Sequence, residues 1–135
     1  MKRLIDKFLL PALCLETFLW VSSASFAQDL DEMRFAVSVQ FDSGLGRNVF
    51  SLNSESNTNL FIQRGSTLVF NTSDETLENH PLRLSFTQDG SHSGGTQAYT
   101  TTIGDNQIIG VDTETPDQLF VYCEKHSGMG QNISI

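Results

Sequence analysis

The chain has 135 residues, which suits one domain of ordinary size, and ten phenylalanines within its 39% of apolar residues can supply a hydrophobic core. Asp and Glu outnumber Lys and Arg by 16 to 8, so the formal charge at neutral pH is −8. Nucleic-acid binding requires clustered lysine and arginine, and this acidic balance therefore argues against nucleic acid as a partner.

Residues 1–27 have the layout of a secretory signal peptide. Basic residues near the start precede a mostly apolar run over 8–21, and small residues stand at the −3 and −1 positions before Gln28. The alternative is a membrane anchor, but a span needs roughly 20 apolar residues. This run is shorter and contains Pro11 and Glu16. We therefore predict cleavage, which leaves residues 28–135 as one exported domain, periplasmic or secreted, without stable membrane insertion.

The exported part shows short apolar stretches separated by turn residues. Residues 35–41 alternate apolar and polar side chains, with the period of two that is typical of a half-buried strand. Further strands are expected at 49–52, 60–63, 67–71, 80–86, 99–103, 107–112 and 119–123, and residues 133–135 close the chain.

Two of the connecting segments carry their own expectations. Gly65 stands between 60–63 and 67–71, which predicts a hairpin-like pair with a tight glycine turn. Residues 89–95, which are mostly Gly and Ser, predict a flexible loop in which His92 is solvated rather than a ligand. No apolar stripe with a helical period persists for three turns. Seven or eight short strands then predict an all-β domain, either a sandwich or a Greek-key barrel.

Cleavage before Gln28 would leave Cys123 as the only cysteine. Exported proteins normally pair their cysteines in disulfides. A lone cysteine in an oxidising compartment therefore forms an intermolecular disulfide, stays buried and inert, or serves as a ligand.

The residues around Cys123 favour the ligand interpretation. Cys123 ends a predicted strand, and His126 and Met129 follow it in the spacing Cys-x2-His-x2-Met. Far upstream, His80 begins another predicted strand, on the same face as Leu82. A β-sandwich can bring this histidine next to the Cys123 loop.

A thiolate, two imidazoles and a thioether are the donor set of a mononuclear blue-copper site. A single cysteine excludes a dinuclear centre with two bridging thiolates, and structural zinc normally prefers Cys or His to Met129 as its fourth ligand. Gly128 and Gly130 are expected to let the ligand loop turn tightly, because glycine adopts backbone angles that other residues avoid.

At these motifs the sequence resembles the cupredoxins, the blue-copper proteins. The similarity covers about residues 35–135 and rests on three segments, Gly-Ser-Thr-Leu-Val-Phe-Asn at 65–71, Asn-His-Pro-Leu at 79–82 and Phe-Val-Tyr-Cys-Glu-Lys-His-Ser-Gly-Met-Gly at 120–130. The short ligand loop is similar to that of the amicyanin-type members. The resemblance implies an all-β, Greek-key β-sandwich that binds one copper ion. Its equatorial ligands would be His80, Cys123 and His126, and its axial ligand Met129.

The resemblance also implies a function. Cupredoxins shuttle single electrons between larger redox proteins, here a cytochrome or a copper enzyme, often through the exposed edge of the C-terminal histidine, here His126. An enzymatic activity is not expected, because three histidines cannot also assemble a cluster that handles oxygen. Two alternatives stay open: a copper-free β-sandwich module for adhesion or interaction, and a periplasmic copper storage or delivery protein.

One position departs from the family pattern. Many cupredoxins place Asn directly after the first histidine, where it ties the ligand loops together, whereas this chain has Pro81. Proline has no N–H to donate. We therefore expect that hydrogen bond to be missing or to be supplied by another residue, such as Asn79, with an effect on the redox potential.

Overall fold

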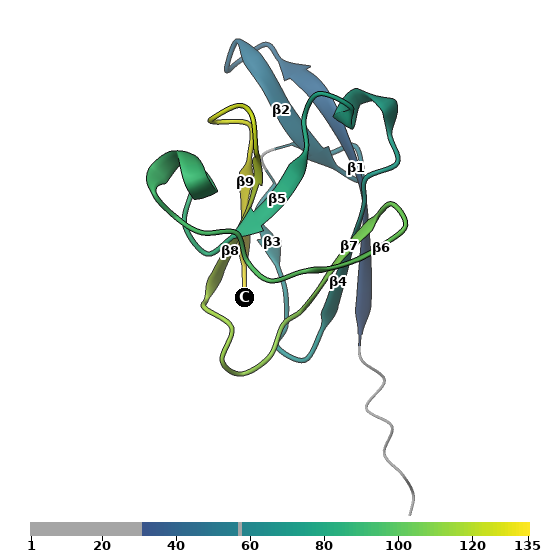
Figure 1. The fold of residues 1–135 in the computed structure, drawn as a ribbon, viewed down its shortest axis with the longest axis vertical. Coiled ribbons are helices and arrows are strands. Elements are labelled where there is room, and N and C mark those ends of the chain that lie inside the picture. The colour runs from purple at the N-terminus through teal and green to yellow at the C-terminus, as the bar shows by residue number, and fades with distance from the viewer. Residues whose placement is uncertain (1–30, 57) are drawn as a thin grey trace, which may run out of the picture.

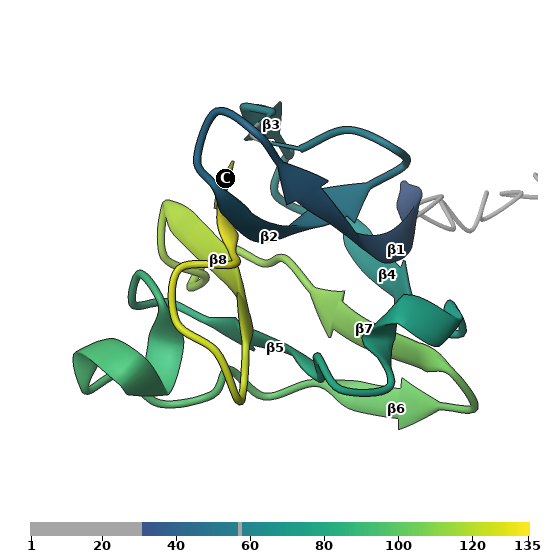
Figure 2. The ribbon, with the colours of Figure 1, turned by 90° about the horizontal axis from the view of Figure 1, so that it is seen from above.

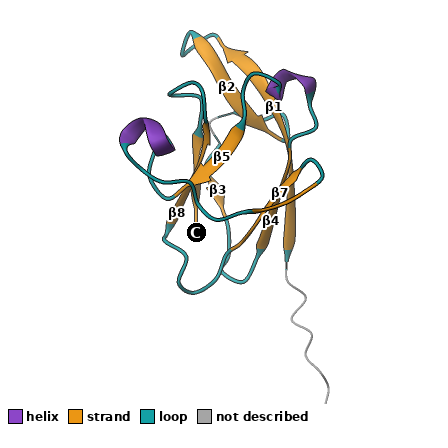
Figure 3. Cartoon of the chain, in the orientation of Figure 1, coloured by secondary structure: helices purple, strands orange, loops and turns teal. Residues whose placement is uncertain are grey.

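The computed structural model describes residues 31–56 and 58–135. The predicted signal peptide, residues 1–27, lies outside the described residues. Within the described ranges, no helix is long and apolar enough to cross a membrane. Figure 3 shows that strands and connecting loops make up nearly all of this part of the chain.

Nine strands and two short 3-10 helices follow one another along the described residues. They are β1 (Glu32–Asp42), β2 (Arg47–Leu52), β3 (Leu60–Phe61), β4 (Thr67–Asn71), η1 (Glu75–Leu77), β5 (Leu82–Ser85), η2 (Gly90–Ser93), β6 (Thr101–Ile103), β7 (Asn106–Gly110), β8 (Gln118–Cys123) and β9 (Gln131–Ser134). The sequence predicts seven or eight strands, and the additional strand is β9 near the C-terminus.

The strands form two sheets that together make a β-sandwich. One sheet has the order β2-β1-β4-β7-β6 and the other the order β3-β9-β8-β5. Of the consecutive strands, β1–β2, β6–β7 and β8–β9 pair as antiparallel neighbours, whereas the other connections pass between the sheets. Crossings of this kind are typical of Greek-key proteins. Figures 1 and 2 show the two layers from perpendicular directions, and the predicted all-β sandwich is confirmed.

The core lies between the two sheets. Its buried side chains include Phe35, Leu68 and Phe70 from the first sheet, and Leu84 and Leu119 from the second. The rings of Phe35 and Phe70 stack, with centroids 5.2 Å apart. Because side chains alternate between the faces of a strand, this inward row fixes which residues of each strand face the core.

The predicted hairpin at Gly65 is wrong. β3 pairs in parallel with β9, whereas β4 pairs with β1 and β7 in the other sheet. Gly65, with a φ of 95°, lies where the chain passes from one sheet to the other. A glycine turn between apolar segments fits a hairpin or a corner equally well. Which of the two forms depends on the strands that pair with each segment. Those strands are distant in the sequence, so no local pattern at Gly65 reveals them.

We expect Phe70→Ala to lower the free energy of unfolding by about 3–5 kcal/mol, because removal of a fully buried ring leaves a cavity. Chemical denaturation of the purified protein measures this change. Phe61→Ala is the matched control, because the Phe61 side chain is 77% exposed whereas Phe70 is 0% exposed. The control should change stability by less than about 0.5 kcal/mol. Equal losses for the two variants would contradict the packing described here.

Candidate metal centre

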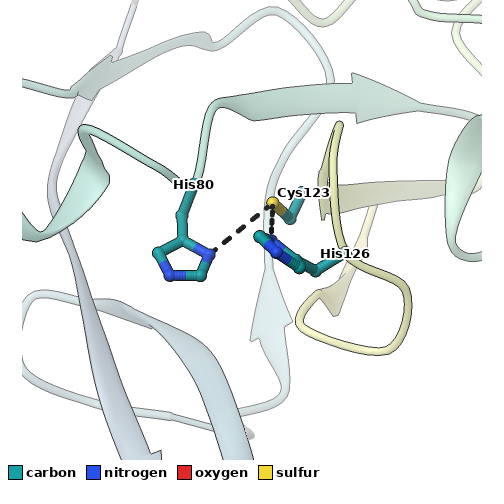
Figure 4. A group of neighbouring side chains, drawn as sticks. All are labelled: His80, Cys123 and His126. Carbon is teal, nitrogen blue, oxygen red and sulfur yellow. Dashed lines mark hydrogen bonds between the residues drawn. The ribbon is translucent and has the colours of Figure 1, made fainter.

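Three potential metal ligands converge at one end of the sandwich. Figure 4 shows His80, Cys123 and His126 with their side chains close together. One ligand atom from each residue lies within 4.8 Å of the others. The sulfur of Cys123 is 3.6 Å from Nδ1 of His126 and 4.0 Å from Nδ1 of His80. These three residues therefore form a group that could hold a metal ion.

The pairing of β5 with β8 brings the group together. In the antiparallel register, Leu82 lies opposite Cys123. His80 precedes Leu82 by two residues, so its side chain lies at the same end of the sheet as the cysteine sulfur. Just beyond the strands, the N–H of Glu124 donates to the carbonyl of Pro81 at 3.0 Å. Pro81 thus contributes an acceptor to the link between the ligand segments, although it has no N–H of its own.

The three side chains differ in their access to solvent. Cys123 is 0% exposed and forms no disulfide within the described residues. His80 is partly buried, and His126 is exposed on the loop between β8 and β9. The group therefore extends from the core, at the sulfur, to the surface, at the second imidazole.

Met129 lies in the same part of the molecule. Its side chain is 3% exposed and, together with His80 and His126, it lines an open cavity of about 260 Å³. Its carbonyl accepts a hydrogen bond of 2.8 Å from the N–H of Phe50, which anchors the loop to β2. Met129 thus lines the same cavity as both histidines, and its role as a ligand stays a prediction.

The local electrostatics favour a neutral, ligating form of His80. Partial burial lowers the pKa of His80 below its usual value, and the nearby His126 and Lys125 lower the pKa further. Histidine binds a metal through the lone pair of its neutral imidazole, so protons compete less well for this residue. Two nitrogen donors and one sulfur donor suit copper and zinc alike, and the geometry of the three groups does not choose between them.

The two glycines of the ligand loop have different roles. Gly128 has a φ of 74°, in the left-handed region that favours glycine, as the sequence suggested. Gly130 has no such backbone angle. A Cβ at Gly130 would instead overlap with the carbonyl oxygen of Val121. Gly130 is therefore required because β8 and the end of the loop approach each other closely.

Sequence reasoning missed two residues that contact this loop. The carboxylate of Asp89 accepts a hydrogen bond of 2.9 Å from the N–H of Gly128. Nε2 of His92 lies 2.9 Å from the carbonyl oxygen of Cys123. His92 is exposed, as expected, but it is not merely solvated, and part of its predicted flexible loop forms η2. Each contact joins a side chain to a backbone group that is far away in the sequence. Such a contact leaves no spacing pattern from which it could be predicted.

Comparison with known proteins gives no family for this chain. No model of a known protein family matches the sequence, and a search of curated proteins finds no significant match. The chemistry of the grouped side chains is therefore the basis for a functional proposal.

We expect Gly130→Ala to destabilise the protein by about 1–3 kcal/mol, because the added methyl group forces apart β8 and the end of the ligand loop. Denaturant unfolding measures the loss. Gly110→Ala is the control, because a Cβ at Gly110 would meet no atom within 4 Å. If both variants were as stable as the unmodified protein, the close approach at Val121 would be refuted.

Proposed function

We propose that this protein is a mononuclear type 1 copper protein of the cupredoxin kind that carries single electrons between redox partners. The observation that supports the proposal is the meeting of one buried thiol and two imidazole nitrogens within 4.8 Å, with Met129 lining the same cavity as both histidines. The resemblance of the ligand motifs to cupredoxins points in the same direction. Copper, when bound, would supply a one-electron couple between its two common oxidation states.

Each residue has a distinct task in this proposal. Cys123 supplies a thiolate from inside the core, where the packing of β8 holds it and excludes water. His80 supplies a nitrogen from a separate segment, so the ligands do not all depend on one loop. Met129 supplies a weak thioether donor, which is the group that tunes the potential of such sites. The four donors suit both oxidation states, because sulfur favours the reduced ion and imidazole also binds the oxidised one.

The exposed ligand defines the route for electrons. His126 is exposed, whereas Cys123 and Met129 are buried. A partner such as a cytochrome or a copper enzyme would approach the edge of the His126 ring most closely. The proposal involves no substrate turnover, so it is not an enzymatic activity. It places the protein in the periplasm or outside the cell, in keeping with the signal-like sequence of residues 1–27.

We expect the purified protein to develop an intense visible absorption band when Cu(II) is added, because charge transfer from a cysteine thiolate to Cu(II) absorbs strongly. Cys123→Ser removes the thiolate with little change in size and should abolish the band. Ser127→Ala, on the same loop but without a proposed ligand, should keep it. A colourless wild-type protein in the presence of Cu(II) would contradict the proposal.

Copper should also raise the melting temperature, since a ligand that binds only the native state stabilises it. At a free copper concentration 1,000 times the dissociation constant, the gain is about 4 kcal/mol. His80→Ala should remove most of this gain, and differential scanning calorimetry measures it. A melting temperature that copper does not change would favour the copper-free adhesion or interaction module. Stabilisation only by a readily exchanged Cu(I) would favour storage or delivery.

A further inference from the structure

The segment between β5 and β6 packs against the ligand loop. It contains η2, which lies beside the end of β8, as Figures 1 and 2 both show. Gly90 lies so close to the ring of Tyr122 that a Cβ at this position would overlap with the ring. The ring of His92 meets Tyr122 edge-on, with centroids 6.3 Å apart. This segment is therefore docked on the residue that directly precedes Cys123.

Asp89 has an unusual backbone and an unusual contact. It stands at the N-cap position of η2 with a φ of 57°, in the left-handed region, which Asp tolerates better than most residues other than glycine. Its carboxylate makes no capping hydrogen bond to η2, although capping is the usual role of Asp at such a position. The carboxylate instead accepts from the N–H of Gly128, 39 residues away. The left-handed backbone at Asp89 thus accompanies a side-chain contact to the ligand loop.

His92 makes the second contact. Its Nε2 lies 2.9 Å from the carbonyl oxygen of Cys123. A carbonyl only accepts hydrogen bonds, so Nε2 of His92 must carry the proton and donate it. The imidazole edge contact with Tyr122 orients the ring for this hydrogen bond.

The two contacts hold opposite ends of the ligand loop. Cys123 begins the loop, and Gly128 directly precedes Met129. We propose that Asp89 and His92 act as a clamp that holds residues 123–129 in the ligand-binding geometry before a metal arrives. Neither residue is a ligand, and both are positioning residues. This inference deepens the proposed function, because it concerns the same ligands.

The clamp adds to the backbone link at Pro81, whose carbonyl accepts a hydrogen bond from the N–H of Glu124. Pro81 has no N–H to donate to the ligand loop. The loop also contains Gly128, and glycine loses more conformational entropy than other residues when the chain becomes ordered. Residues that hydrogen-bond around a metal site commonly fix its ligands, and their loss typically lowers metal affinity by 10–100-fold. Asp89 and His92 provide such support from one adjoining segment.

The negative charge of Asp89 should also affect the reduction potential of the site. An anion beside the loop favours the more positive, oxidised ion. Asp89→Asn removes the charge and keeps an acceptor oxygen of the same size. This variant should therefore raise the reduction potential and leave the loop ordered, a combination that a purely structural role would not produce.

The first test uses the metal-free protein. Hydrogen exchange followed by NMR should show the Gly128 amide exchanging at least tenfold faster in Asp89→Ala than in the wild type, and within about threefold of the wild type in Asp89→Asn. Ser91→Ala, at an exposed position of η2, is the control and should match the wild type. Unchanged Gly128 exchange in a folded Asp89→Ala variant would overturn the clamp.

The second test measures copper binding and separates two properties of the His92 side chain, its aromatic ring and its N–H donor. His92→Phe keeps a ring against Tyr122 but removes the donor, and should lower Cu(II) affinity 10–100-fold. His92→Gln keeps an N–H donor and should stay within a few-fold of the wild type. Equal affinities for these two variants would overturn the role of the hydrogen bond, and this comparison also decides the question if Asp89→Ala fails to fold.

The copper-protein proposal and the clamp proposal can be refuted independently of each other. A wild-type protein that binds no copper would refute the proposed function, while exchange of the Gly128 amide in the metal-free protein would still decide whether the clamp exists. A wild-type visible band with no effect of Asp89→Ala on exchange or affinity would overturn the clamp and leave the copper proposal standing.

Discussion

The antiparallel pairing of β5 with β8 is the constraint on which the candidate metal centre depends. His80 and Cys123 are 43 residues apart in the sequence, and the register that places Leu82 opposite Cys123 brings them to the same end of one sheet. This register is specified by the core, because Leu84 and Val121 are paired and both buried. A slip of one residue would turn the cysteine side chain to the opposite face of the sheet. The position of the donor atoms is therefore a consequence of hydrophobic packing.

The same packing leaves one side of the candidate metal centre buried and the other side exposed to solvent. The sulfur of Cys123 faces the core, and His126 faces solvent, within a group a few ångströms across. Burial restricts access to the free thiol of Cys123 and so hinders disulfide exchange. Of the two imidazoles, that of His126 is the more exposed. These properties agree with the proposed electron carrier, in which the partner reaches the exposed imidazole and the ion stays in place.

The sequence predicted local features of the fold and the site better than distant ones. The strand at 67–71 and the Cys-x2-His-x2-Met spacing are local patterns, and β4 spans the predicted residues. The hairpin at Gly65 was wrong because β3 and β4 pair with strands far away in the sequence. Gly130 is needed for a close approach to Val121, which no backbone preference reveals. Asp89 and His92 contact backbone groups 39 and 31 residues away, and such contacts leave no periodic signal.

The proposed clamp bears on the choice between electron transfer and copper delivery. Electron transfer is fastest when the ligands move little between oxidation states, so a preformed loop serves it. Delivery requires release of the ion to a receiving protein, for which a loop that opens easily is better suited. Asp89 and His92 tie both ends of the loop to a segment docked on Tyr122, and opening the loop would break both hydrogen bonds. These two hydrogen bonds therefore support the proposed electron carrier better than a copper delivery protein.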